Sequence, residues 1–255
     1  MIEWNPRIWA FGCSETFGHG LEDCYIKKDG FYAPGKEPSK FAYPQLIGDT
    51  VGKEVINLSR PGASNKHILQ QIKLNQSEIN KDDIVIIHWT YIERHAIFTC
   101  HIDERGISEG RKTGDKTFGS LNITSHWPDL YNIIPTDTEK IAKQYYKYIH
   151  SDSDAIIVIR WYMNYAHLTL KAQGVKSIHC PPLMNSQYNN NKSLINMKSW
   201  HEYDFLKDPN FESDISFVSK MLRHDDIQKD SAIDGRHSGP KTHRAFADLI
   251  LKEFF

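Results

Sequence analysis

The sequence predicts an α/β protein with three α/β/α layers, in which helices cover both faces of a central parallel sheet of about five strands. Short apolar runs typical of buried parallel strands alternate with longer segments of helical periodicity. The chain has 255 residues, 40% of them hydrophobic and 25% charged, which suits a single domain over residues 1–255. The formal net charge of −1 argues against nucleic-acid or membrane binding through bulk electrostatics.

Each predicted element has its own local signal. Strands are expected where apolar runs are bounded by turn-forming residues, at residues 7–11, 54–58, 83–89, 155–160 and 176–180. Helices are expected at residues 38–51, 65–79, 136–150, 162–172 and 240–254. Ser64 or Asn65 is a candidate cap for the second helix, and Thr136 and Glu139 have the spacing of a capping box for the third.

Two long polar stretches interrupt this alternation. Residues 99–135 contain several glycines, and residues 181–233 contain a run of three asparagines. Loops of this length in a compact domain are usually functional or disordered. Because both stretches follow predicted strands, we expect them to shape a substrate site at the carboxyl edge of the sheet.

The sequence also suggests a cellular setting. The N-terminal residues lack the features of a secretory signal, and the apolar runs are far shorter than the ~20 residues of a membrane-spanning helix, so we expect a cytoplasmic protein. The four cysteines lie far apart, which favours free thiols. His95, His101 and Asp103 lack a recognised ligand spacing, so we expect no metal site.

Ser14 is the candidate nucleophile. It follows the first predicted strand on a turn between Gly12 and Gly18, where its hydroxyl would face the carboxyl edge of the sheet. A serine hydroxyl is a poor nucleophile at neutral pH and needs an adjacent base. The alternative is that Ser14 only caps a helix.

Asp234 and His237 are the candidate partners of that serine. They lie three residues apart just before the last predicted helix. An imidazole can shuttle the proton of a serine, and a carboxylate on its other nitrogen fixes the tautomer and the ring orientation. The alternative is a helix cap. We expect the other histidine of this region, His243, at the surface.

Two further segments follow predicted strands and are candidates for binding an oxyanion or a substrate. Gly62 lies in a Pro-Gly turn, where its N–H is free to donate, although a simple turn is the alternative. Thr90 ends the third strand and carries a hydroxyl donor. Nearby Arg94 is a candidate contact for an anionic substrate group, and Trp89 is either a substrate contact or a packing residue.

Together, these segments resemble the conserved blocks of the SGNH/GDSL hydrolase superfamily. Residues 12–18 read Gly-Cys-Ser-Glu-Thr-Phe-Gly, with Cys13 in place of the aspartate of the family's first block. Gly62 corresponds to the glycine of the second block, and Thr90 stands where the third block has an oxyanion-binding asparagine. Asp234 and His237 match the last block. The sequences of these segments also resemble those of phage-encoded members of the superfamily.

The resemblance implies a flavodoxin-like fold and acyl transfer without a cofactor. Ser14 would attack an ester carbonyl, with His237 as base and Asp234 orienting it. The N–H groups of Ser14 and Gly62 would bind the oxyanion together with Thr90. Loss of one oxyanion donor typically lowers turnover ~100–1,000-fold, so a threonine in place of the asparagine bears directly on activity.

The leading interpretation is a serine esterase that removes small acyl groups, such as O-acetyl, from a saccharide or a similar small alcohol. One alternative is a binding or structural protein that keeps the fold with little or no turnover, which the threonine at position 90 favours. Another is an acyltransferase, which would use the same three residues with an acceptor other than water.

Overall fold

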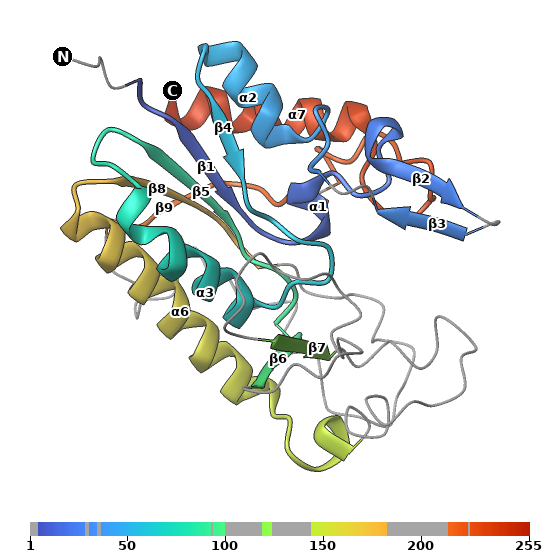
Figure 1. Cartoon of the computed structure of the whole chain (residues 1–255), viewed down its shortest axis with the longest axis vertical. Coiled ribbons are helices and arrows are strands. Elements are labelled where there is room, and N and C mark those ends of the chain that lie inside the picture. Colours follow the sequence, from blue (N-terminus) through green and yellow to red (C-terminus); the bar gives the residue numbers. More distant parts are fainter. Residues whose placement is uncertain are drawn as a thin grey trace.

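The computed structural model describes residues 5–28, 31–34, 37–92, 94–99, 119–123, 144–182, 214–223 and 225–255 (Figure 1). Its centre is a five-stranded, wholly parallel sheet in the order β4-β1-β5-β8-β9. The strands are β1 (Ile8–Phe11), β4 (Val55–Asn57), β5 (Ile84–His88), β8 (Lys176–Cys180) and β9 (Ser216–Phe217). This order, with β1 inside the sheet and the chain wound outward on both sides, is the flavodoxin-like topology.

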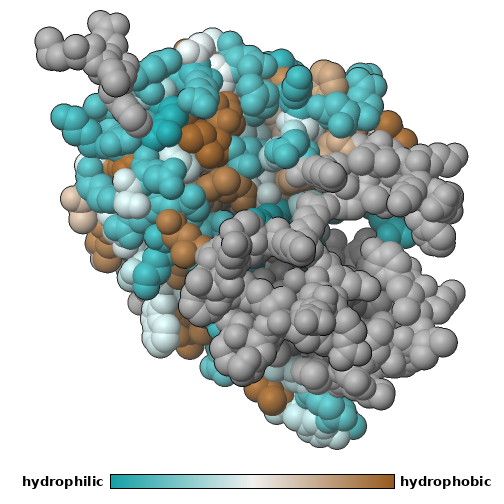
Figure 2. Space-filling model, viewed as in Figure 1, coloured by the Kyte–Doolittle hydropathy of each residue, from teal (hydrophilic) through white to brown (hydrophobic). Residues whose placement is uncertain are grey.

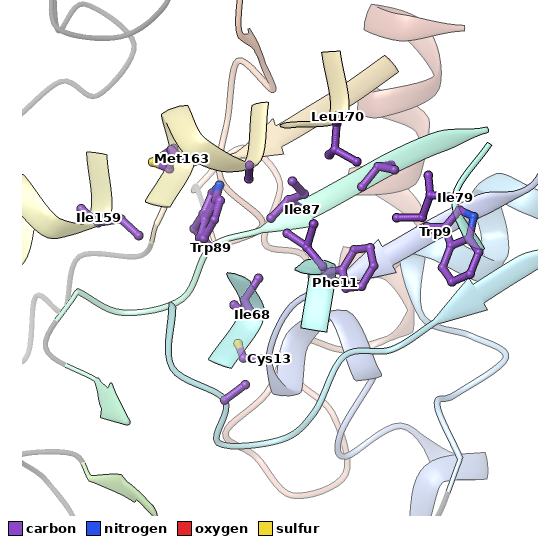
Figure 3. Close-up of a cluster of buried hydrophobic side chains, with 14 of the residues drawn as sticks. Trp9, Phe11, Cys13, Ile68, Ile79, Ile87, Trp89, Ile159, Met163 and Leu170 are labelled. Carbon is purple, nitrogen blue, oxygen red and sulfur yellow. The ribbon is translucent and has the colours of Figure 1, made fainter. Parts of the chain in front are cut away.

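Helices cover both faces of the sheet (Figure 1). On one face lie α2 (Tyr43–Val51) and α7 (Pro240–Phe254), and on the other lie α3 (Asn65–Asn75) and α6 (Asp152–Ala172). Successive strand residues point to opposite faces, so Ile8 and Ile86 enter the core under α2 and α7, while Trp9 and Ile87 enter the core under α3 and α6 (Figure 3). The predicted three-layer architecture is therefore confirmed.

The predicted strand at residues 155–160 is wrong, because this run lies inside α6. Its β-branched residues favour a strand locally, but Ile156, Ile159 and Met163 are buried at helical spacing against the sheet. Ser151 caps the helix by accepting a hydrogen bond from the backbone N–H of Asp154 at 3.3 Å. The fifth strand is instead β9, which pairs with β8 and falls within the second long polar stretch.

The other predicted elements lie close to their expected positions. The helix expected at residues 38–51 begins only at Tyr43, with a proline in its first turn, and the one expected at residues 65–79 ends at Asn75 before the 3₁₀ turn η2 (Gln76–Glu78). Helix α7 matches its expected range. Most of the helix expected at residues 136–150 lies outside the described residues, as do residues 183–213 of the second polar stretch.

Two small antiparallel hairpins were not predicted. After the 3₁₀ turn η1 (Glu22–Cys24), β2 (Tyr25–Lys28) pairs with β3 (Phe31–Pro34), and β6 (His95–Thr99) pairs with β7 (Gly119–Ile123) across the first polar stretch. Both lie beyond the carboxyl edge of the sheet (Figure 1). No helix in the described part of the chain is long and apolar enough to cross a membrane.

A buried carboxylate fixes the start of β1 against the start of β5. Asp83 is 1% exposed and accepts hydrogen bonds from the backbone N–H of Arg7 at 2.8 Å, the indole of Trp9 at 2.8 Å and the backbone N–H of Asn80 at 3.0 Å. Burial raises the pKa of Asp83, but these hydrogen bonds outweigh it and hold the pKa below its usual range. The carboxylate therefore sets the register of the two central strands.

Candidate active site

Ser14 is the first residue of a one-turn helix, α1 (Ser14–Phe17), that follows β1. A Cβ atom on Gly12 would lie 2.1 Å from Oγ1 of Thr16, so only glycine lets the chain turn this tightly between strand and helix. Gly18 ends the helix in the left-handed conformation, with φ 76°. Ser14 is thereby fixed at the carboxyl end of a central strand, with 6% of its surface exposed.

Asp234 and His237 form a hydrogen-bonded pair on the loop before α7. The ring Nδ1 of His237 lies 2.5 Å from Oδ2 of Asp234, and Oδ1 accepts the backbone N–H groups of Arg236 at 2.9 Å and His237 at 3.0 Å. Burial raises the pKa of Asp234, but these bonds outweigh it and hold the pKa well below its usual range. Because a carboxylate only accepts, Nδ1 carries the hydrogen and Nε2 is left as the basic nitrogen.

The Asp234–His237 loop packs against the segment that follows Ser14. The ring of His19 stacks on that of His237 with centroids 4.6 Å apart, and the N–H of His19 donates to the carbonyl of Ser14 at 2.9 Å. A Cβ atom on Gly20 would lie 2.9 Å from the carboxyl carbon of Asp234. In the described part of the chain no hydrogen bond joins the Ser14 hydroxyl to His237.

The buried Glu15 and the partly exposed Arg223 form an ion pair beside these residues. The Glu15 carboxylate accepts hydrogen bonds from Nε of Arg223 at 2.8 Å, from its Nη2, and from the backbone N–H of Ser238 at 3.3 Å. Nη2 of Arg223 also donates to the carbonyl of Arg236 at 2.8 Å. The pair therefore joins the helix that carries Ser14 to the loop that carries His237.

Electrostatics keep Glu15 charged despite its burial. Burial raises its pKa, but the charge and hydrogen bonds of Arg223, together with the neighbouring His237 and His243, outweigh it and lower the pKa below its usual value. Sequence reasoning missed both members of the ion pair, and the one available signal was an acidic residue directly after the candidate nucleophile, within a buried segment.

Gly62 lies in a turn that is hydrogen-bonded to the segment preceding Ser14. The N–H of Arg60 donates to the carbonyl of Gly12 at 3.1 Å, and the N–H of Ala63 closes the turn on the carbonyl of Arg60, also at 3.1 Å. Gly62 has φ 80°, which a Pro-Gly turn requires of this residue. Within the described residues the N–H of Gly62 has no acceptor. Ser14 is the first residue of α1, so its N–H has no acceptor within that helix.

Thr90 is fully buried at the end of β5 and holds the guanidinium of Arg94. Oγ1 of Thr90 accepts Nη1 of Arg94 at 3.0 Å, and that guanidinium lies 4.8 Å from the ring centroid of Tyr91. The side-chain amide of Asn65 accepts the Thr90 N–H at 2.7 Å and donates to its carbonyl at 3.1 Å. Since arginine only donates, the hydroxyl proton of Thr90 remains available to another acceptor. The cap of α3 is Ser64 rather than Asn65.

Trp89 belongs to the hydrophobic core. It is fully buried, its indole donates to Nδ1 of His179 at 3.1 Å, and it faces Met163 and Ile159 of α6 (Figure 3). It has no exposed surface with which to touch a substrate, which favours the packing interpretation.

Two buried histidines lie beneath the site. His243 is fully buried rather than at the surface, and its Nδ1 accepts the backbone N–H of Tyr43 at 3.2 Å, while Nδ1 of His88 lies 3.4 Å from the Tyr43 hydroxyl. Burial lowers the pKa of each histidine to about 4, so both are neutral at neutral pH. Sequence reasoning missed these buried histidine contacts because each histidine is separated from its partner by a long stretch of chain.

The described residues contain no cluster of three or more histidine, cysteine, aspartate or glutamate side chains of the kind that holds a metal ion. Cys13, Cys24 and Cys180 are buried free thiols.

The fold and site define a flavodoxin-like α/β/α domain with a serine after its first strand and a hydrogen-bonded Asp–His pair before its last helix. No protein-family model and no curated protein matches the sequence. Solved structures with this fold include a protein assigned to the lipolytic G-D-S-L family from Desulfitobacterium hafniense DCB-2, with a TM-score of 0.50, 11% identity and coverage of 98% of this chain and 100% of that one.

A second similar structure is a carbohydrate esterase family 2 enzyme with a carbohydrate-binding domain from Corynascus thermopiles (Myceliophthora fergusii). It has a TM-score of 0.52 and 12% identity, and the match covers 97% of this chain but 64% of that longer one. The chain therefore has the fold of SGNH/GDSL hydrolases, as its sequence motifs predict.

Proposed function

We propose that this protein is an SGNH-type serine esterase with Ser14 as nucleophile, His237 as base and Asp234 as positioning carboxylate. The observation that carries the proposal is the 2.5 Å contact between His237 and Asp234, on a loop packed against the segment that follows Ser14. An Asp–His hydrogen bond of this kind leaves Nε2 as the proton acceptor that a serine nucleophile needs.

In the proposed reaction, Ser14 Oγ attacks the ester carbonyl carbon while His237 Nε2 takes the hydroxyl proton. The tetrahedral intermediate collapses, the bond to the alcohol oxygen breaks, and His237 returns the proton to the departing alcohol. Water then attacks the acyl-serine with His237 again as base, which releases the carboxylic acid and restores Ser14. The N–H groups of Ser14 and Gly62 are the proposed donors to the oxyanion. Thr90 is fully buried, so in this proposal it acts through Arg94, whose guanidinium its hydroxyl oxygen accepts.

We further propose a small acyl ester, such as an O-acetyl group on a saccharide, as the substrate. Support comes from the shared fold of a carbohydrate esterase family 2 enzyme. Arg94 has donors left over after its bonds to Thr90 and Ala63, and in this proposal it contacts a polar or anionic part of the substrate.

The test is hydrolysis of p-nitrophenyl acetate and of acetylated oligosaccharides by the wild type and Ser14→Ala. We expect Ser14→Ala to lower turnover by more than about 1,000-fold with little change in thermal stability. Ser77→Ala, at an exposed serine in η2, is the matched control and should keep full activity. Equal activity of Ser14→Ala and wild type would refute the nucleophile. A well-folded wild type without turnover on any ester would favour a binding protein, and ester synthesis with an added alcohol would favour an acyltransferase.

A further inference from the structure

The outward face of α6 carries a stripe of large apolar side chains. Ile157 is 42% exposed, Trp161 67%, Tyr165 48% and Leu168 44%, and their spacing of four, four and three residues places them on one face of the helix. The opposite face is buried against the sheet through Ile156, Ile159, Met163, Ala166 and Leu170. A helix on the surface of a soluble domain normally presents polar residues outward.

The size of this stripe is compatible with an interaction surface. The exposed parts of the four side chains amount to roughly 400 Å², which is within the range of the largest apolar patches on monomers, and such patches are often functional. Hydrophobic residues are visible among hydrophilic ones at the surface on the side of the molecule along which α6 runs (Figure 2). The stripe is also continuous, since it follows about three turns of one straight helix.

The order of residues along the stripe is close to palindromic. Ile157 and Leu168 lie equally far from the midpoint between Tyr162 and Met163, and Trp161 and Tyr165 lie within one residue of the same symmetry. An interface between identical copies across a twofold axis requires this property, because residue i must face residue j while j faces i. An antiparallel second α6 would set Ile157 of one copy against Leu168 of the other and Trp161 against Tyr165.

The charges at the two ends of the stripe select the antiparallel direction. Asp154 and Lys171 are both exposed and lie equally far from the same midpoint. An antiparallel pair therefore brings Asp154 of one copy to Lys171 of the other at both ends, whereas a parallel pair brings like charges together. Lys171 already lies 2.6 Å from Asp214 in its own chain, and an ammonium group has further donors for a second carboxylate.

We propose that α6 forms the interface of an antiparallel homodimer through this stripe. The two stripes together bury roughly 800 Å², less than the ~1,200–2,000 Å² of stable specific interfaces. The dimer is therefore weak and reversible. The proposal is independent of the esterase assignment, because α6 lies on the layer away from the loop of His237 and Asp234.

The first test is sedimentation velocity of the full chain over a wide range of concentrations. We expect a reversible monomer–dimer equilibrium that Trp161→Glu abolishes, while Tyr148→Glu, at an equally exposed aromatic residue outside the stripe, leaves it unchanged. A wild type that stays monomeric at every concentration would overturn the proposal. So would a marked loss of thermal stability in monomeric Trp161→Glu, because it would mean that the stripe is covered by the protein's own chain.

The second test establishes direction. Under mild oxidation, a mixture of Asp154→Cys and Lys171→Cys proteins should form disulfide-linked heterodimers, while each variant alone and the wild type should not. Homodimers of the single variants without heterodimers would indicate a parallel pair and contradict the proposed geometry. Trp161→Glu introduced into both variants should abolish the crosslink.

Discussion

Replacing Arg223 with methionine removes the positive charge that neutralises the buried Glu15 carboxylate. Glu15 is 2% exposed, and without Arg223 its remaining hydrogen bond in the described part of the chain is the N–H of Ser238 at 3.3 Å. Removing one partner of a buried ion pair costs ~3–5 kcal/mol. Because the Arg223 side chain is 31% exposed, water replaces part of the lost interaction, and we expect a loss near the lower end, about 3 kcal/mol.

This loss of stability should depend on pH. In the wild type the Glu15 pKa lies below its usual value of 4.5, so its contribution is present above that pH and is lost as the pH falls through the folded-state pKa. In Arg223→Met burial dominates and the Glu15 pKa moves above 4.5, so the folded state tolerates the neutral carboxyl group and is destabilised as the pH rises. The cost of the substitution should therefore be largest at neutral pH and shrink toward pH 4.5.

Denaturant unfolding of the wild type and Arg223→Met at neutral pH and at about pH 5 measures both effects. The matched control is Glu15→Gln combined with Arg223→Met, which removes both charges and should be more stable than Arg223→Met alone at neutral pH. A loss below about 1 kcal/mol, or a loss that grows as the pH falls, would refute the view that Glu15 is a buried carboxylate held charged by Arg223.

Three further predictions concern the supporting structure. The pKa values of His88 and His243 are lowered from 6.5 to about 4, so the free energy of unfolding should fall by up to about 3 kcal/mol for each as the pH drops from 6.5 toward 4, and constant urea midpoints across this range would contradict their burial as neutral rings. Gly12→Ala should lower stability by ~1–3 kcal/mol and reduce ester turnover, because its Cβ would lie 2.1 Å from a neighbouring hydroxyl; unchanged melting and turnover would show that the turn before α1 yields. Asp83→Asn should cost about 2 kcal/mol in denaturant unfolding, because an amide nitrogen cannot accept the N–H groups that the carboxylate binds, and an unchanged midpoint would mean that water satisfies them.

Much of the sheet could be predicted because its strands lie in short apolar runs with turn-forming residues on either side. The strands expected at residues 7–11, 54–58, 83–89 and 176–180 match β1, β4, β5 and β8 in position. Residues 155–160 were wrongly predicted as a strand because their β-branched side chains favour one. The helical spacing of their buried positions becomes apparent only when α6 is packed against the sheet. Strand β9 is two residues long, too short for any periodicity to reveal it.

In the candidate site, contacts between residues close in sequence could be predicted, and contacts between distant residues could not. Asp234 and His237 are three residues apart, so the sequence could place both on one loop and suggest a hydrogen bond between them, with a helix cap as the alternative. Glu15 and Arg223 are separated by 208 positions, and each is ordinary in its own stretch of sequence. Only the fold brings them together, and the buried Glu15 carboxylate and Arg223 then link the serine helix to the histidine loop.

The central claim is that Ser14 is an activated nucleophile, and labelling with a fluorophosphonate tests it most directly. We predict one covalent adduct per chain, located on Ser14 by mass spectrometry, absent in Ser14→Ala and formed far more slowly in His237→Ala. A correctly folded wild type that gains no adduct, or an adduct on another serine, would contradict the account.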